Sequence, residues 1–339
     1  MTTPGEENRA ELVDSFGRRI EYLRVSVTDR CNYRCSYCMP EEGVALGTHR
    51  EFLTFEEITR LIRLFSELGT RRVRLTGGEP LVRRNVIDLV KMVGSLPAIT
   101  DLSISTNGHL LERFALSLKN AGVQRVNISL DSIDPENFAR ITRGGDLNAV
   151  IRGIEAALDA GLAPVKLNMV VMKGINDREI ESMLDFALRL RADLRFIETM
   201  PVGVSGVESM THYYPASLIL KRVEDRSGMD LIPVKGDLGA GPARYYRVGA
   251  GPMKIGVISA VSRHFCEGCN RVRLTTRGEL VLCLGQENCV PLREHLRGGC
   301  SDAALKEAIR AAILTKPERH DFLIYPGKKN LKTMSAVGG

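Results

Sequence analysis

The stretch IEYLRVSVTDRCNYRCSYCMP, residues 20–40, joins a run of β-forming residues to a loop that contains Cys31, Cys35 and Cys38. A β-rich run bounded by polar turn residues predicts a strand followed by a loop. Clustered cysteines in a chain without signs of secretion are more often metal ligands or catalytic groups than disulfides. We therefore expect a thiol-bound site directly after the first strand.

Similar β-rich runs recur along the next part of the chain and alternate with helical patterns. Helical periodicity occupies residues 54–69, 111–122 and 177–191. Thr54 with Glu57 forms a capping box, Asp134-Pro135 is typical of a helix start, and Gly69, Gly122 and Gly161 are typical of helix ends. This alternation predicts parallel strands joined by crossover helices, in either a doubly wound sheet or part of a barrel. The six expected strands are residues 20–28, 71–77, 101–106, 124–131, 164–171 and 193–199.

Polar motifs accompany these strands. The first thiol loop, TGGEP at 76–80, STNG at 105–108 and SLDS at 129–132 each follow a strand, and ETMP at 198–201 ends the sixth. In both candidate architectures, ligands bind at the carboxyl ends of the strands. We therefore expect these motifs to face one site.

After about residue 205 the pattern breaks into shorter pieces. Residues 271–284, RVRLTTRGELVLCL, predict a hairpin that turns at Arg277-Gly278, and residues 301–314 predict a helix. The chain ends in a basic tail with two glycines. We therefore divide it into residues 17–205 and 206–339.

Composition describes a globular chain with a sizeable core. The 339 residues are 44% hydrophobic and 26% charged, and 47 basic against 41 acidic residues give a net charge of +6. The first residues, MTTPGEENRAELVD, include acids and no apolar core, which argues against a signal or transit peptide. No stretch reaches the roughly 18 apolar residues of a membrane span. We therefore expect a cytoplasmic protein that interacts with no membrane.

Several arginines stand beside apolar residues in the expected strands. They are Arg24, Arg74, Arg271 and Arg273. A guanidinium among buried neighbours needs an anion or a position at the rim. Arg271 and Arg273 alternate along one strand, so both point to the same face and repel each other unless an anion lies between them.

The two sets of cysteines differ in what their spacing decides. Three thiolates can hold a cubane iron-sulphur cluster by three irons and leave the fourth iron open, whereas zinc would need a fourth ligand and usually paired Cys-x2-Cys units. This favours a cluster at Cys31, Cys35 and Cys38. The second set, Cys266, Cys269 and Cys283, fits a zinc ribbon equally well, with Cys289 or Cys300 as the fourth ligand.

The first thiol loop resembles that of the radical S-adenosylmethionine superfamily, and Gly77-Gly78-Glu79 resembles the superfamily's segment for the methionyl amine. The whole of 17–339, with GPARYY, FCEGCNRVRLT, GELVLCL and the final Gly-Gly, resembles the superfamily's GTP 3′,8-cyclase family. The resemblance implies an incomplete (β/α)6 TIM-like barrel closed by a C-terminal region with a second [4Fe-4S] cluster. The implied reaction converts GTP to (8S)-3′,8-cyclo-7,8-dihydroguanosine 5′-triphosphate, the first step of molybdenum cofactor biosynthesis.

The resemblance also implies roles for individual residues. Cys31, Cys35 and Cys38 would hold the first cluster, and Cys266, Cys269 and Cys283 the second. The S-adenosylmethionine contacts would be Tyr37, Gly78, Ser129 and Met200. The GTP contacts would be Arg24, Arg74, Ser105, Lys166, Arg271, Val272 and Arg273. Catalysis would involve Arg271, Arg273, Gly338 and Gly339, with the tail inside the barrel. Cys289 and Cys300 match nothing in the family pattern, and we interpret them as small buried residues.

Partners follow from the same resemblance. They are a low-potential electron donor such as flavodoxin or ferredoxin, cyclic pyranopterin monophosphate synthase downstream, and a second copy in a homodimer. Two alternatives remain: a radical enzyme that modifies peptides, and a zinc-ribbon protein that binds nucleic acid. A peptide modifier would carry more auxiliary cysteines. A nucleic-acid protein would show stacking aromatics, yet aromatics are only 5% here, so we expect no nucleic acid.

Overall fold

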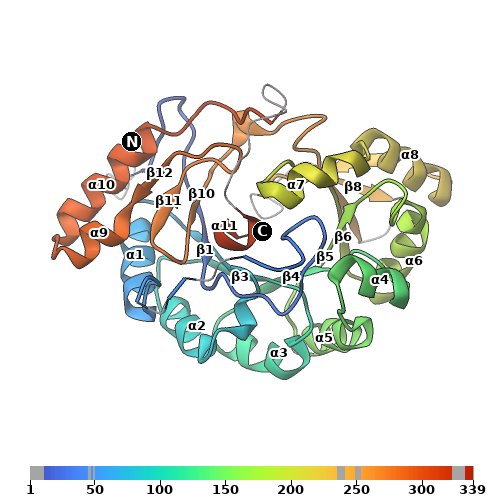
Figure 1. The fold of residues 1–339 in the computed structure, drawn as a ribbon, viewed down its shortest axis with the longest axis horizontal. Helices are drawn as coiled ribbons and strands as arrows, with labels where there is room; N and C mark the ends of the chain where they lie inside the picture. The colour runs from blue at the N-terminus through green and yellow to red at the C-terminus, as the bar shows by residue number, and fades with distance from the viewer. Residues whose placement is uncertain are drawn as a thin grey trace, which may run out of the picture.

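Six parallel strands form the wall of an open barrel in the computed structural model, which describes residues 11–44, 47–48, 50–234, 241–248, 253–322 and 333–338 (Figure 1). Each strand pairs in parallel with the next along the chain. The strands are β1 (Tyr22–Ser26), β2 (Arg72–Thr76), β3 (Asp101–Thr106), β4 (Arg125–Ser129), β5 (Val165–Val171) and β6 (Asp193–Glu198).

Helices cover the outer face of this wall (Figure 1). They are α1 (Phe55–Glu67), α2 (Val86–Gly94), α3 (Leu111–Asn120), α4 (Pro135–Thr142), α5 (Leu147–Asp159) and α6 (Ile180–Leu190), with short 3-10 turns η1 (Pro80–Val82) and η2 (Asp177–Glu179). The expected capping box at Thr54 and Glu57 is present, and Asp134 caps α4 ahead of Pro135. Because these helices lie outside the strands, the incomplete barrel is confirmed and the doubly wound sheet is wrong.

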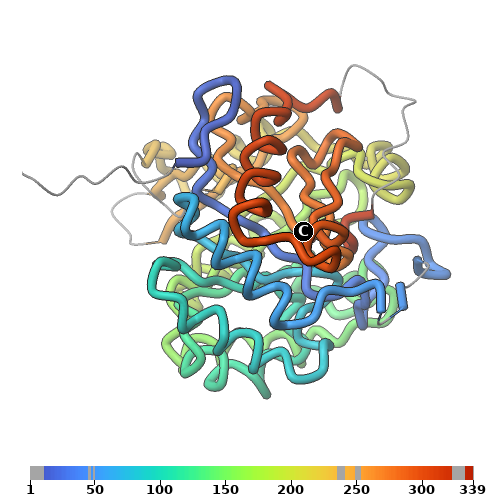
Figure 2. Tube along the Cα trace, turned by 90° about the vertical axis from the view of Figure 1, so that its left-hand side faces the viewer, coloured from blue at the N-terminus to red at the C-terminus, as the bar shows by residue number. Residues whose placement is uncertain are grey.

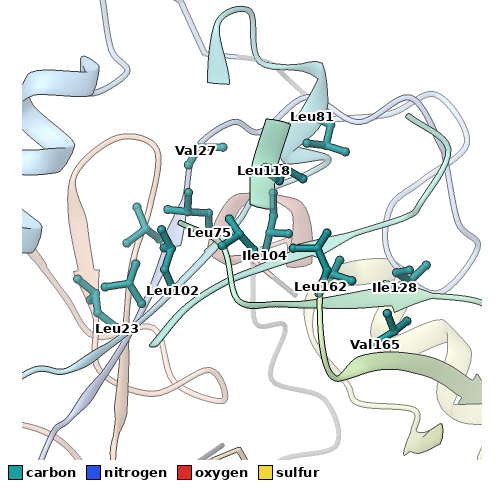
Figure 3. Close-up of a cluster of buried hydrophobic side chains, with 14 of the residues drawn as sticks. Leu23, Val27, Leu75, Leu81, Leu102, Ile104, Leu118, Ile128, Leu162 and Val165 are labelled. Atoms are coloured by element: carbon teal, nitrogen blue, oxygen red, sulfur yellow. The ribbon is translucent and has the colours of Figure 1, made fainter. Parts of the chain in front are cut away.

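The hydrophobic core lies between the strands and the outer helices. Figure 3 shows Leu23, Leu75, Leu102 and Ile128 pointing from neighbouring strands toward the same layer. All four side chains are at most 1% exposed. Alternation along each strand then turns the intervening, largely polar residues into the barrel. The apolar pattern of the strands thus decides which side chains line the interior.

The C-terminal region extends the same sheet at both edges. On one side β9 (Lys254–Ile258) pairs in parallel with β6 and is followed by β8 (Arg244–Val248) and β7 (Leu231–Val234). On the other side β10 (Arg271–Leu274) pairs in parallel with β1 and is followed by β11 (Glu279–Val281) and β12 (Cys289–Pro291). The 12-stranded sheet therefore crosses the expected boundary at 205, and the two-part division stays a prediction.

The remaining elements close the structure. They are α7 (Gly203–Ser209), η3 (Met210–His212), α8 (Ala216–Ser227), η4 (Cys266–Gly268), α9 (Leu292–Arg297), α10 (Asp302–Leu314) and α11 (Met334–Val337). The expected hairpin is confirmed, with Gly278 at φ +77°, and the helix expected at 301–314 is α10. Helix α10 packs beside α1, where Arg60 and Arg63 bind Asp302 (Figure 2). Helix α11 lies inside the arc of strands (Figure 1).

Two expectations about this region are answered by burial. The interpretation of Cys289 and Cys300 as buried is wrong for both: Cys289 is exposed on the terminal strand β12, and Cys300 is only partly buried. A strand with one neighbour leaves its outer side to solvent, which is why Cys289 is exposed. Among the helices of the described ranges, none has the length and apolar character needed to cross a membrane.

Candidate active site

Five arginines point into the barrel from four strands. Their exposed fractions are at most 8%, and in the described part of the chain none of them forms an ion pair with a carboxylate. Among the described residues, the Nε atoms of Arg24, Arg195 and Arg271 have no hydrogen-bond partner. Buried guanidinium groups of this kind require an anion. The five are Arg24, Arg74, Arg195, Arg271 and Arg273.

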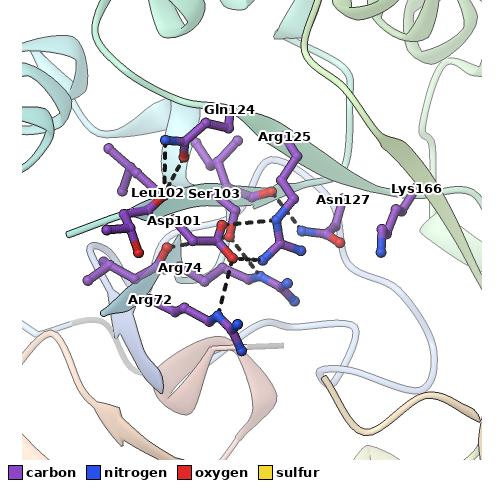
Figure 4. A network of polar contacts seen from close by, with 12 residues as sticks. Arg72, Arg74, Asp101, Leu102, Ser103, Gln124, Arg125, Asn127 and Lys166 are labelled. Atoms are coloured by element: carbon purple, nitrogen blue, oxygen red, sulfur yellow. Dashed lines mark hydrogen bonds and ion pairs between the residues drawn. The ribbon is translucent and has the colours of Figure 1, made fainter. Parts of the chain in front are cut away.

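The amino ends of strands β2 to β6 carry paired charges instead. Figure 4 shows Asp101 between Arg125 and Arg72, with Arg125 donating two hydrogen bonds to the carboxylate. On the neighbouring strand β5, the Nζ of Lys166 lies 3.9 Å from Asp193 Oδ2 and donates to the Tyr245 hydroxyl at 3.0 Å. Apart from Arg271, the five arginines without carboxylate partners among the described residues therefore lie further along their strands, nearer to the carboxyl ends, than these pairs do.

The closeness of the arginines to one another affects their pKa values. Burial, together with the charges of Arg24 and Arg195, lowers the pKa of Arg74 to about 9. Burial also lowers the pKa of Arg273, and its neighbours Arg24 and Arg271 act in the same direction. A polyanion among these groups would relieve both the desolvation and the mutual repulsion.

One cavity runs from these arginines to the second cysteine set and to Tyr37 of the first thiol loop. Its lining includes Tyr37, Ser129 and Met200 at the carboxyl ends of the strands. Gly78, Lys166 and the first three cysteines do not line it, although Tyr37 stands beside Cys38. Further lining residues that sequence analysis assigned are Arg24, Arg74, Ser105, Arg271, Val272, Arg273, Cys266, Cys269 and Cys283.

The first thiol loop is held by backbone contacts to α4. The N–H groups of Arg34 and Ser36 donate to the carbonyls of Thr142 and Ile141 at 3.0 and 2.9 Å. Burial raises the pKa of Cys35, with further increases from Asp131 and the other two thiols, and it raises that of Cys38 to about 12. These mutual effects place the three thiols within electrostatic reach of one another.

The Gly-Gly segment packs against the chain just before the thiol loop. A Cβ on Gly77 would lie 2.4 Å from the Thr28 carbonyl oxygen, and one on Gly78 would lie 2.3 Å from that of Arg30. Gly78 N–H donates to the Thr28 carbonyl at 2.7 Å. No larger side chain fits at either position, so the two motifs form one rigid unit.

Glu79 ties this unit to the next strand. Its buried carboxylate accepts hydrogen bonds from the Thr106 hydroxyl and the Asn107 N–H, both at 2.7 Å, and from the Leu81 N–H at 3.0 Å. Burial raises the pKa of Glu79 to about 7. The TGGEP and STNG motifs are therefore joined through this one carboxylate.

In the second cysteine set, Cys266 begins η4, Cys269 directly follows it, and Cys283 lies in the loop after β11. Burial opposes ionisation of Cys269, but Arg271, Lys316 and Arg18 outweigh it and lower the pKa of the thiol. Within the described ranges, no three His, Cys, Asp or Glu side chains converge as a chelate for a single metal ion. Cys266, Cys269 and Cys283 therefore share one end of the cavity with a cationic surrounding.

The C-terminal turn α11 reaches the arginines. The guanidinium of Arg273 donates to the carbonyls of Val337 and Gly338. Gly338 has φ +77°, and a Cβ there would lie 2.3 Å from Thr76 Cγ2. The described tail thus meets the cavity wall at a position where glycine is required. Gly339 lies outside the described residues.

Sequence reasoning missed Arg195 and Asp131. Arg195 donates to Asn127 Oδ1 inside the barrel and is 4% exposed, and Asp131 accepts from the Tyr37 hydroxyl at 2.8 Å. Arg195 stands in DLRF, residues 193–196, where polar and apolar residues alternate, which places Arg195 on the face opposite to Leu194 and Phe196. That alternation was a usable signal. Asp131 lies in SLDS, where a motif was noted but only Ser129 was assigned.

Comparisons with known proteins cover almost the whole chain. Residues 25–187 match the family described as Radical SAM superfamily, and residues 192–322 match Molybdenum Cofactor Synthesis C. A GTP 3′,8-cyclase of Hydrogenovibrio crunogenus is 50% identical over 329 residues, with 97% of this chain and 99% of the relative covered. One of Marinobacter nauticus is 48% identical over 335 residues, with 98% and 99% covered.

A solved structure shares the fold at low identity. Streptococcus suis SuiB bound to S-adenosylmethionine superimposes with a TM-score of 0.61 and 15% identity, over 93% of this chain and 76% of that chain. Likeness at this identity concerns the arrangement of strands and helices alone.

Proposed function

The chain belongs to the GTP 3′,8-cyclase family of the radical S-adenosylmethionine superfamily, and on this premise we propose that its barrel converts GTP to (8S)-3′,8-cyclo-7,8-dihydroguanosine 5′-triphosphate. It is an enzyme of molybdenum cofactor biosynthesis, and the family implies S-adenosylmethionine and two [4Fe-4S] clusters as cofactors. The observation that carries the proposal is the cavity in which five buried arginines, without carboxylate partners among the described residues, adjoin a set of three thiols.

Two sets of cysteines would hold the clusters. Soft thiolates are the ligands that iron-sulphur clusters take, and three of them leave one iron open. The first cluster would be bound by Cys31, Cys35 and Cys38, and the second by Cys266, Cys269 and Cys283. When bound, the first cluster and S-adenosylmethionine would supply the radical chemistry that moves hydrogen from C3′ of the ribose to the deoxyadenosyl group, and one electron and one proton would complete the C3′–C8 ring closure.

S-adenosylmethionine would lie across the carboxyl ends of the strands, in contact with Tyr37, Gly78, Ser129 and Met200. The close packing of Gly77 and Gly78 on residues 28–30 supports this, because it fixes the two glycines beside the thiol loop. The hydrogen bond from Tyr37 to Asp131 holds the aromatic ring at the cavity wall. These residues would orient the cofactor rather than react with it.

GTP would lie between the two ends of the cavity. Its phosphates would be bound by guanidinium groups of Arg24, Arg74, Arg271 and Arg273, which suit phosphate oxygens. Arg195 belongs to the same group by burial and by its unpartnered Nε. Ser105 and Val272 line the same cavity, and Lys166, beneath it beside Asp193, would complete the set.

Arg271, Arg273 and the tail would organise the cyclisation. The contact of Arg273 with the Gly338 carbonyl ties the end of the chain to the substrate cations. In that position the tail excludes water from the barrel while its glycine leaves room for the ribose. Gly339 would extend the same contact.

Partners and location complete the proposal. A low-potential donor such as flavodoxin or ferredoxin would supply electrons, and cyclic pyranopterin monophosphate synthase would take the product. Thiol-bound clusters require a reducing compartment, which supports the cytoplasm. A homodimer would be the assembly.

The experiment is anaerobic reconstitution with iron and sulphide, followed by reduction with S-adenosylmethionine and GTP. Mass analysis should find 5′-deoxyadenosine and a cyclised nucleotide with the mass of GTP. A protein that carries two clusters and forms no 5′-deoxyadenosine would overturn the proposal.

A further inference from the structure

Lys316 is a buried cation without a carboxylate partner in the described part of the chain. Its side chain lies just after α10, the residue is 3% exposed, and the Nζ donates a hydrogen bond to the carbonyl of Leu282. Lys306 of α10, by contrast, pairs with Glu67 and is partly exposed. Lysine is almost never fully buried unless it is paired, so Lys316 needs a negative group that the described residues do not supply.

The second cysteine set is the group that Lys316 faces. Leu282, which accepts the hydrogen bond, directly precedes Cys283. The ammonium group therefore lies against the backbone that carries the Cys283 thiol.

Arg18 fixes the segment that carries Lys316. Its guanidinium donates to the carbonyls of Cys266 at 2.9 Å and of Pro317 and Glu318 at 2.6 Å each. The charge of Arg18 is paired with Asp14 at 2.6 Å. Arg18 thus clamps the turn of Cys266 to the segment after α10, while the uncompensated charge in this place belongs to Lys316.

A buried carboxylate lies beside the first cysteine set, because Tyr37, next to Cys38, donates to Asp131, which is 2% exposed. The guanidinium of Arg34 donates to the Cys31 carbonyl at 2.6 Å, but Arg34 is only partly buried. A buried cation placed behind thiol ligands is therefore a feature of the second set, and general packing of cysteines does not account for it.

We propose that Lys316 is the counter-ion of the second cluster and makes that cluster easier to reduce. The inference rests on the proposed binding of a cluster by Cys266, Cys269 and Cys283. One-electron reduction adds one negative charge to a thiolate-bound cluster, with no bond formed or broken. A fixed cation in a site of low dielectric favours the more negative state, and surrounding charge is among the factors that set cluster potentials. Lys316 acts through the cluster and not on the reacting atoms. It is therefore a positioning residue, which places a positive charge beside the cluster.

The test is a redox titration of the two-cluster protein with dithionite, followed by electron paramagnetic resonance. The variants are Lys316→Met, which keeps the stem without the charge, and Lys316→Arg, which keeps the charge. Lys306→Met, in the preceding helix α10, is the matched control. The same titration in a chain with Cys31, Cys35 and Cys38 replaced by Ala assigns the signal of the second cluster.

We expect Lys316→Met to move the midpoint of the second cluster to more negative potential, with the first cluster unchanged, and Lys316→Arg and Lys306→Met to match the wild type. Failure of Lys316→Met alone to load the second cluster, with Lys316→Arg loading it, would also support the role of charge. An unchanged midpoint in a fully loaded Lys316→Met protein would overturn the inference, as would loss of the cluster in both Lys316 variants. Iron content of the wild type tests the second cluster itself, so the two failures are distinguishable.

Discussion

The hydroxyl of Tyr37 donates a hydrogen bond to Asp131 at 2.8 Å and so connects the thiol loop to the end of β4. The other carboxylate oxygen of Asp131 accepts from the Val170 N–H at 2.8 Å, which adds β5 to the connection. Burial raises the pKa of Asp131 to about 6, so the carboxylate is ionised and accepts both bonds above that pH. Three strand ends are therefore positioned by one side chain.

Replacing Asp131 by Asn should weaken S-adenosylmethionine binding. An amide cannot accept equally from both sides, and loss of one hydrogen bond to a charged group costs about 1.5–3 kcal/mol, so roughly tenfold or more in affinity is expected. Equilibrium binding to the cluster-loaded protein measures this. Tyr37→Phe, which removes the donor alone, should show a smaller effect, and unchanged affinity in both variants would contradict the connection.

Metal content separates the two cysteine sets. The wild type should hold about eight irons when fully loaded, as expected for two cubane clusters. Cys31→Ala should abolish 5′-deoxyadenosine formation, whereas Cys283→Ala should keep the first cluster and impair GTP turnover. Metal analysis and product chromatography measure these outcomes. One zinc and four irons per chain would rule out a second cluster.

Replacing Arg195 by Met should weaken GTP binding without affecting either cluster. The guanidinium is 4% exposed, and its Nε has no partner. Loss of one charge-assisted hydrogen bond costs about 1.5–3 kcal/mol, which corresponds to about 10- to 100-fold in affinity. Arg189→Met removes an exposed arginine of α6 and is the control. Equal GTP affinity in the two variants would remove Arg195 from the substrate site.

Adding a methyl group to Gly338 should suppress cyclisation. In Gly338→Ala the new Cβ would lie 2.3 Å from Thr76 Cγ2, so the tail must move away from Arg273. Misplacement by about 1 Å can reduce turnover about 100-fold. Thr76→Ser removes the opposing methyl group, so the double variant should recover part of the cyclised product. Full turnover in Gly338→Ala would show that the tail contact is not needed.

The ionisation of Glu79 should make stability depend on pH. Its pKa is raised from 4.5 in the unfolded chain to about 7 in the folded protein, because burial disfavours the charged form. The folded state then binds the proton more tightly, so the free energy of unfolding should fall as the pH rises from 4.5 to 7. Denaturant titrations of Glu79→Gln should show a flatter profile than those of Glu155→Gln, an exposed control. Parallel profiles would contradict this assignment.

Local signals in the sequence predicted the barrel strands, part of the helices and the candidate ligands. The alternation of apolar residues predicted all six barrel strands, and Thr54, Asp134 and Gly278 predicted helix starts and a turn through their own backbone preferences. Thiol spacing singled out both cysteine sets for the same reason, because such patterns depend on neighbours a few residues apart.

Contacts between distant segments were decided only by the tertiary structure. The register that sets β10 beside β1 brings Arg24 level with Arg273. In the same region, Arg18 contacts Cys266, which is 248 positions further along the chain. No local preference encodes which strand edge a later segment joins, because that depends on the total apolar surface buried when the barrel closes. The sequence by itself determined the barrel strands, the caps and the candidate ligands. Only the closed sheet brought the five arginines to one cavity, the tail to Arg273 and Lys316 to the segment of Cys283.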